Sequence, residues 1–486
     1  MAASNDDDRA SGDGASETKI APTPEEPEPP KVPDVELIVD GFGFMPKSLQ
    51  RQDKRTSNVF DKSAKALKDI LLPEPEEGRS PCASSTNIDI VRRYTWKTKN
   101  RMTVQVITYG ATLTSIQVPD RKGVPDDVVA GFDTLEEYFS SRNPYFGSTI
   151  GRTANIICDG TMVVRPSGRI YMLSTNKGHH HYHGGYIGFD KVNWRSYVTG
   201  NKVIMSHVSE RFTEGYPGTV LAQIAFEVTC DNTIKIEMRC TTSEPTIVNL
   251  SNCPYFNLAG HHAGCEAIYD HMFTINADKY TVTTESGVVT GEKKVVGGTP
   301  YDFRVPRLLR TMLPRVPMGG YELNFCITQG TEQDLTFHGR ALHPCTGRVL
   351  EVYSNQPGME FYTGNLLPDP DKIVEPLPTD AEEENEVKSQ SEVAGEEGSE
   401  TSKSEISENG EEALAEGSEG KVSYGYVPLM GKDGTFYKKH GLFCFMPQNF
   451  PDAVNHKNFP SPILNPGEVY VHRIQYKFGL LIGKYV

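Results

Sequence analysis

Short runs rich in β-branched and aromatic residues recur along most of this 486-residue chain, and long helical periodicities are absent. Glycine, proline, asparagine and aspartate bound these runs, as expected for strands joined by turns. Within 103–118 apolar and polar residues alternate, and Gly110 marks a bulge or turn. The other runs are Val203–Val208, Val220–Thr229, Thr233–Cys240, His271–Asn276, Arg348–Ser354 and Glu468–Phe478. Many strands and few helices predict an all-β fold, built as a large antiparallel β-sandwich.

The net charge of −15 is concentrated in two segments of low complexity. Residues 380–420 carry 15 acidic and 2 basic side chains, and residues 1–30 carry 8 and 2. Outside them the chain has about four net positive charges, which gives no electrostatic case for nucleic acid as a partner. Segments so poor in apolar residues cannot offset their ordering entropy. We therefore expect a disordered acidic tail at 1–34 and a disordered Ser/Glu-rich insert at 369–421, and we interpret both as candidate regions for protein partners.

These segments define the expected domain organisation. One β-sandwich domain spans 87–368 and 422–486, and the acidic insert joins two of its strands. Residues 35–86 form a poorly defined N-terminal extension, in which apolar residues at helical spacing predict a short amphipathic helix over 63–72. Pro73 would end that helix.

Cysteine usage indicates the compartment. Nine cysteines are scattered along the chain without a Cys-x-x-Cys pair. The N-terminal residues are polar and acidic and do not resemble a secretory signal, and no window has the apolar length of a transmembrane helix. An odd cysteine count without such a signal is typical of a reducing compartment with free thiols. The sequence therefore predicts a cytoplasmic protein that does not span a membrane.

Ordered motifs run through the β-rich part of the chain. The most informative is 249–260, Asn-Leu-Ser-Asn-Cys-Pro-Tyr-Phe-Asn-Leu-Ala-Gly. The others lie at 145–155, 183–194, 214–218, 356–365 and 448–455. In this order they resemble segments of the aldose 1-epimerases, the galactose mutarotases, and the resemblance covers roughly 90–365 and 425–480. It implies the galactose mutarotase-like β-supersandwich fold.

The chemistry of that family requires two proton-transfer groups. Mutarotation opens a cyclic sugar and closes it on the other face, with one group protonating the ring oxygen and another deprotonating the anomeric hydroxyl. The resemblance implies a His as the acid and a Glu as the base, but Cys253 and Met446 stand at these positions. A thioether cannot accept a proton here, and an unperturbed thiol is a poor acid at neutral pH. We therefore predict that the acid–base pair is missing.

Other positions that the resemblance implies for sugar contact are also changed. Ile156 stands where the family has an Arg. Glu322 matches an Asp that binds sugar hydroxyls, and Leu323 replaces the His that follows that Asp. Glu322 is interpreted as a substrate-binding residue rather than a displaced base, because the extra methylene moves its carboxylate.

Three polar residues remain at positions that the resemblance implies for the sugar site: Asn155, His183 and Gln356. His183 either donates to a sugar hydroxyl or supports the following Gly-Gly turn. Gln356 either contacts the sugar or is a hydrogen-bonding residue at a strand end. The three histidines 179–181 precede His183, but adjacent side chains point in different directions, so we expect a solvated loop and no metal site.

These substitutions decide the expected function. Losing one positioned acid or base typically costs about a hundred- to ten-thousand-fold in rate, and both are replaced here. We expect a galactose mutarotase-like carbohydrate-binding protein with impaired catalysis, a pseudoenzyme that uses no cofactor and takes a monosaccharide such as galactose or glucose. Two alternatives stay open. One is an active aldose 1-epimerase with relocated catalytic groups, and the other is a protein-interaction scaffold without a sugar ligand.

Overall fold

The computed structural model describes residues 34–46, 89–369 and 427–481, apart from 166, 318 and 331–333. The expected disordered tail, the helix predicted over 63–72 and nearly all of the acidic insert lie outside these residues. Elsewhere strands dominate, and the helices are short: α3 (Leu135–Phe139), α4 (Gly264–Tyr269) and α5 (Leu309–Met312). Within the described residues no helix is long and apolar enough to cross a membrane.

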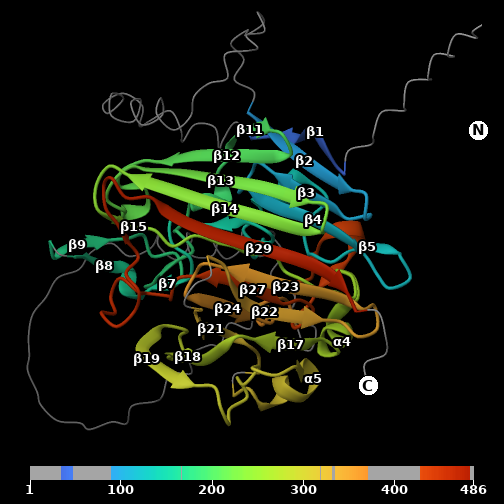
Figure 1. Ribbon diagram of the computed structural model, residues 1–486. Helices are drawn as coiled ribbons and strands as arrows, with labels where there is room; N and C mark the ends of the chain where they lie inside the picture. Colours follow the sequence, from blue (N-terminus) through green and yellow to red (C-terminus); the bar gives the residue numbers. More distant parts are fainter. Residues whose placement is uncertain are drawn as a thin grey trace, which may run out of the picture. The chain divides into compact units, whose positions relative to one another are not determined.

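The largest sheet has nine strands in the order β11-β12-β13-β14-β29-β23-β22-β17-β20, and its neighbouring strands are antiparallel (Figure 1). In chain order they are β11 (Arg195–Thr199), β12 (Lys202–Ser209), β13 (Val220–Thr229), β14 (Thr233–Thr242), β17 (Met272–Ile275), β20 (Arg307–Leu308), β22 (Thr336–Leu342), β23 (Arg348–Ser354) and β29 (Tyr470–Leu480). The six runs predicted between 203 and 478 all form strands of this sheet, because they alternate in burial and carry β-branched and aromatic side chains.

Two five-stranded sheets accompany it. The first contains β1 (Val35–Phe44), β2 (Ile90–Thr98), β3 (Thr103–Ile107), β4 (Thr112–Pro119) and β5 (Pro125–Asp127) in sequence order. The second has the order β19-β18-β21-β24-β27, formed by β18 (Ala277–Thr283), β19 (Val289–Val295), β21 (Glu322–Ile327), β24 (Gly358–Tyr362) and β27 (Cys444–Gln448). The turn predicted at Gly110 lies between β3 and β4, with φ at +64°.

The hydrophobic core joins the three sheets. Trp96 of β2, Ile224 of β13 and Phe361 of β24 belong to one buried cluster. The ring of Phe273 in β17 lies 5.0 Å from that of Phe361 and 5.8 Å from that of Phe445 in β27. Both five-stranded sheets thus share a core with the nine-stranded sheet, and the predicted all-β sandwich is confirmed.

Short two-stranded ladders connect these sheets and shape the loops. They pair β6 (Thr149–Ile150) with β16 (Ser251–Asn252), β7 (Ile156–Ile157) with β10 (His181–Tyr182), β8 (Thr161–Val164) with β9 (Arg169–Met172), β15 (Thr246–Ile247) with β28 (Ile463–Leu464), and β25 (Leu429–Met430) with β26 (Phe436–Tyr437). The β7/β10 ladder places Asn155 and His183 next to each other, because these two residues lie directly at one of its ends.

Strand β1 was not expected, since 35–86 reads as a poorly defined extension. Val35–Phe44 pairs along its whole length with β2, and Val35 and Leu37 pack against the core. The register shifts between Gly41 and Gly43, where the strand bends. The sandwich domain therefore includes these ten residues.

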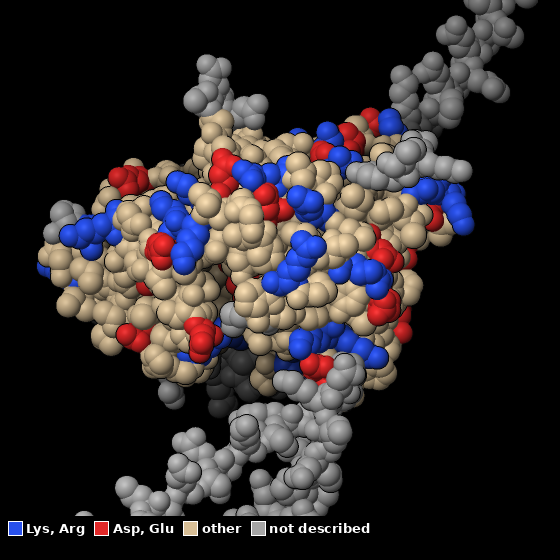
Figure 2. Space-filling model, turned by 90° about the horizontal axis from the view of Figure 1, so that it is seen from below, with Lys and Arg blue, Asp and Glu red and all other residues tan. Residues whose placement is uncertain are grey.

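The surface seen in Figure 2 carries lysine, arginine, aspartate and glutamate side chains interspersed with one another. Neither sign of charge forms one large patch on this face. This distribution agrees with the small net charge that the sequence gives outside its two acidic segments.

Candidate functional site

One face of the second five-stranded sheet carries most of the candidate site. Glu360 of β24 lies opposite Met446 of β27, and Glu322 of β21 lies opposite Tyr362 of β24. Side chains alternate between the two faces of a strand, so these four residues share one face. Phe361, between Glu360 and Tyr362, packs on the other face in the hydrophobic core. The sheet register thus brings together residues that are more than one hundred positions apart in the sequence.

Cys253 and Met446, the residues that the sequence analysis assigns to the acid and base positions, are in contact. Cys253 Sγ lies 3.3 Å from Met446 Sδ. Both residues are buried, with 2% and 4% of their surface exposed, and both belong to an apolar cluster with Tyr255 and Cys444. The backbone fixes Cys253 firmly, because its N–H donates to the carbonyl oxygen of Ser148 at 2.9 Å. Two sulfur atoms are therefore in contact inside an apolar cluster.

Glu360 is a buried carboxyl group that the sequence analysis missed. Only 6% of the residue is exposed. Its Oε2 accepts hydrogen bonds from Asn155 Nδ2 at 3.1 Å and from Gln448 Nε2 at 3.3 Å. Burial, together with the nearby Glu322 carboxylate, raises the pKa of Glu360 to about 8. The signal in the sequence was a single Glu in the middle of the otherwise apolar strand Gly-Met-Glu-Phe-Tyr.

Asn155 and His183 hold each other at the end of the β7/β10 ladder. The Asn155 N–H donates to His183 Nδ1 at 3.0 Å, and the His183 N–H donates to the Asn155 carbonyl oxygen at 3.2 Å. Both residues have positive φ, 66° and 50°, so the backbone turns away from the ladder at this end of both strands. His183 is buried, and burial holds its pKa well below the usual range, so the ring is neutral. Its ring also contacts those of Tyr145 and Tyr182, with centroid distances of 4.7 and 3.8 Å.

Glu322 occupies the exposed edge of this arrangement. Partial desolvation raises the pKa of its carboxyl group, and the positive charge of Lys177 opposes that rise. The Lys177 ammonium lies 4.1 Å from the centre of the Tyr182 ring, a cation–π contact. Glu322, Glu360 and Lys177 are thus titratable groups that act on one another across the candidate site.

Comparisons with known proteins show the family of this chain. The model of the family described as Aldose 1-epimerase matches residues 92–477. The chain belongs to the aldose 1-epimerase family. The galactose mutarotases of Bos taurus and Homo sapiens are 36% and 37% identical to it over 381 and 377 residues, which is 78% of this chain and 92% and 91% of theirs. The structure of an aldose epimerase homologue from C. elegans covers 79% of this chain and 97% of its own, with a TM-score of 0.62 at 23% identity. The expected mutarotase-like fold is confirmed.

Arg152, in one of the segments that resemble the aldose epimerases, holds neighbouring loops together. The Arg152 guanidinium is buried and donates to the carbonyl oxygens of Ser209, Glu210, Pro217 and Gly218 at 2.9–3.1 Å. Ile156, where the resemblance implies a sugar-binding Arg, is a buried apolar residue of strand β7. Arg152 cannot replace the missing cation, because loop carbonyl groups already take its donors.

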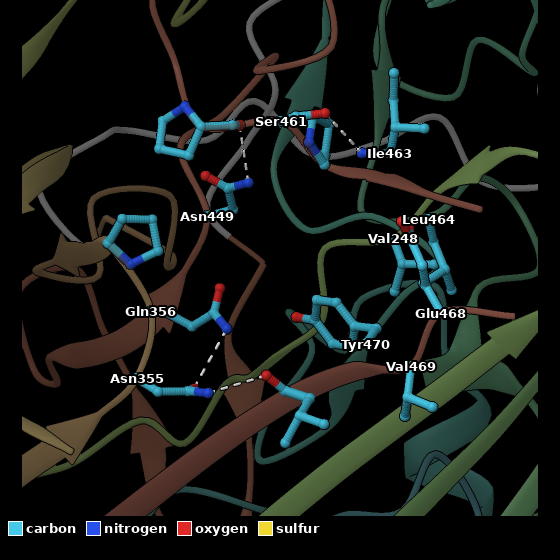
Figure 3. A pocket seen from close by; sticks show the side chains of 14 residues that line it. Val248, Asn355, Gln356, Asn449, Ser461, Ile463, Leu464, Glu468, Val469 and Tyr470 are labelled. Carbon is cyan, nitrogen blue, oxygen red and sulfur yellow. Dashed lines mark hydrogen bonds between the residues drawn. The ribbon is translucent and has the colours of Figure 1, made fainter. Parts of the chain in front are cut away.

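Gln356 lies apart from the other predicted site residues of this aldose epimerase family member. It lines a pocket of about 610 Å³ together with Asn355, Asn449 and Tyr470, as Figure 3 shows. Its side-chain Nε2 donates to Asn355 Oδ1 at 3.4 Å, and its carbonyl oxygen accepts from His338 Nε2 at 3.1 Å. No residue of the Asn155, Cys253 and Glu360 group lines this pocket. The sugar contact expected of Gln356 therefore stays a prediction.

The run of histidines differs from the expected solvated loop. His179 is exposed, but His180 and His181 are buried. His181 Nε2 pairs with the Tyr216 hydroxyl at 2.6 Å. Strand β10 begins at His181 and turns this side chain inward.

Proposed function

We propose that this aldose 1-epimerase family member is a carbohydrate-binding protein with strongly impaired mutarotase activity. One observation carries the proposal, the 3.3 Å contact between Cys253 Sγ and Met446 Sδ. A buried thiol beside a thioether can neither accept the anomeric proton nor donate efficiently to a ring oxygen at neutral pH. The missing Arg at Ile156 removes a further contact that the family resemblance implies.

The polar groups that remain support binding of a neutral sugar. Asn155 and Gln448 place amide groups beside Glu360, and Glu322 adds a carboxylate at the exposed edge. Sugar hydroxyl groups both donate and accept, so carboxylate and amide pairs suit them. Tyr145 and Tyr182, whose rings both contact His183, add aromatic surface beside these polar groups. We propose galactose or glucose as the ligand, with no cofactor.

A second candidate function, active mutarotation with relocated groups, is favoured by Glu360. At pH 7 a carboxyl group with a pKa of about 8 is mostly protonated and can act as an acid. Glu322, the more exposed carboxyl group, would then be the base. Carboxyl groups whose environments separate their pKa values divide acid and base roles in other enzymes.

The decisive experiment is magnetisation-transfer NMR between α- and β-galactose, with and without the full-length protein. No acceleration by a folded sample, together with a galactose-dependent rise in Tm, supports an impaired sugar-binding protein. Acceleration that scales with protein concentration contradicts it. If that acceleration disappears in Glu360→Gln but not in Gln356→Ala, the relocated acid is Glu360.

The remaining alternative is a scaffold without a sugar ligand. Failure of galactose and glucose to raise Tm, with no acceleration, would favour it over sugar binding. Interaction with protein partners through the acidic segments is part of our proposal in either case, and a cytoplasmic location remains the expectation from cysteine usage. The eight cysteines within the described residues are all free thiols.

A further inference from the structure

A second cluster of chemically active side chains lies at the other end of the β7/β10 ladder. Within the ladder, Ile157 faces His181 and Ile156 faces Tyr182. Cys158 directly follows β7 and His180 directly precedes β10, so these two residues form the next position outward. Asn155 and His183 occupy the opposite end, three positions away, at a distance of roughly 10 Å along the strands.

Three residues of this outer end offer metal-ligand atoms close together. Side-chain ligand atoms of Cys158, Asp159 and His180 all lie within 4.8 Å of one another. Asp159 belongs to the 3-10 turn η2 (Cys158–Gly160) and has φ at +52°, which places its backbone N–H 3.1 Å from His180 Nδ1. His179 Nε2 lies 3.4 Å from Asp159 Oδ1, and both side chains are exposed.

His180 turns one ring nitrogen toward Asp159. Its Nδ1 lies 3.7 Å from Asp159 Oδ1 and accepts the Asp159 N–H, and the residue is only 7% exposed. A metal ion at this cluster would bind Nδ1 in place of that N–H. Nε2, which is buried with no hydrogen-bond partner among the described residues, would keep the ring proton.

The donor set identifies the metal. A thiolate, an imidazole and a carboxylate are the ligands of Zn²⁺, which binds three or four of them in a tetrahedron. Binding of Zn²⁺ would release the Cys158 thiol proton to solvent as the metal–sulfur bond forms, and His180 would bind as a neutral imidazole.

We propose that Cys158, Asp159 and His180 form a Zn²⁺ site at the outer end of the β7/β10 ladder. The fourth position is open to water or to His179. The site is separate from the sugar-binding residues and takes no part in proton transfer. It would hold β7 and β10 together, and these strands position Asn155 and His183 at the other end.

The test is a Zn²⁺ titration of the reduced full-length protein, in competition with a chromophoric chelator. We expect Asp159→Asn and Cys158→Ser each to weaken Zn²⁺ binding at least about tenfold. Asn tolerates the positive φ at position 159 well, so Asp159→Asn should leave the fold intact. Every variant keeps the acidic segments, so weak binding by carboxylates elsewhere cancels in the comparison.

The chain offers a closely matched control. Asp433 lies in another Asp-Gly 3-10 turn, η6 (Lys432–Gly434), with φ at +53° and His261 Nε2 3.6 Å away, and the residue before it is Lys432 rather than a cysteine. Asp433→Asn and the exposed Cys345→Ser should leave Zn²⁺ affinity unchanged. Binding of Co²⁺ should also produce a thiolate-to-metal absorption band that Cys158→Ser abolishes. Equal Zn²⁺ affinity in wild type, Asp159→Asn and Cys158→Ser, or the absence of the Co²⁺ band, would overturn the proposal.

Discussion

The two halves of the candidate site meet where strands β24 and β27 pair, but they have opposite chemical character. On one side Cys253 and Met446 place two sulfur atoms in contact inside an apolar cluster. On the other side lie the two carboxyl groups of Glu360 and Glu322, and burial together with the nearby Glu322 raises the pKa of Glu360. A single register pair, Glu360 opposite Met446, marks the boundary between them.

This difference separates proton transfer from the rest of the site. In our proposal the sulfur half lacks the acid and base that the family resemblance implies, whereas the carboxyl half keeps a titratable group that can bind or protonate a ligand. If the proposal holds, two side chains account for the loss of catalysis while the fold persists. Three changes test the separation, beginning with the one of largest expected effect.

Placing an acid and a base in the sulfur half should give it the proton-transfer groups that it lacks. We expect Cys253→His with Met446→Glu to accelerate galactose anomer exchange at least about a hundredfold over the wild-type protein, because each positioned proton-transfer group typically contributes that much or more. Magnetisation-transfer NMR measures the effect. Each single variant, with only one partner, is the control and should gain far less. A folded double variant that binds galactose but shows no acceleration would contradict the assignment of these two positions.

The carboxyl half should make stability depend on pH. Between its ordinary value of 4.5 and about 8, folded Glu360 retains a proton that the unfolded chain has released. Its contribution is therefore complete below about pH 4.5 and is lost as the pH rises toward 8, with a slope of at most about 1.4 kcal/mol per pH unit. Urea unfolding of Glu360→Gln should show a smaller decline between pH 5 and 8 than wild type. Glu322→Gln is the matched control, and its exposed position should give a weaker change.

A polar substitution in the sulfur half should destabilise the protein. Cys253→Ser places a hydroxyl group against the Met446 thioether, and we expect a loss of about 1–3 kcal/mol in unfolding free energy. Cys345→Ser, at an exposed cysteine, should stay within about 0.5 kcal/mol. Chemical denaturation under reducing conditions compares the two. A Cys253→Ser variant as stable as Cys345→Ser would show that position 253 is open to water.

The sequence predicted the strands of the sandwich well because alternation and turn residues are local signals. Val220–Thr229 and Arg348–Ser354 match the observed strands residue for residue. Glu360 was not predicted as a site residue because its role depends on its cross-strand neighbours, which are set by the register of β24 and β27. The burial of His180 and the separate pocket of Gln356 depend likewise on long-range packing.

The hydrogen bonds of Arg152 affect how a ligand would bind. One guanidinium ties the loop before Asn155 to the backbone of residues 209, 210, 217 and 218. Because these bonds are internal to the protein, they are present before any sugar binds. The loop therefore pays little ordering entropy on association. Recognition at this end of the molecule should resemble the docking of a small solute on a rigid surface, with single-step kinetics and no slow conformational phase.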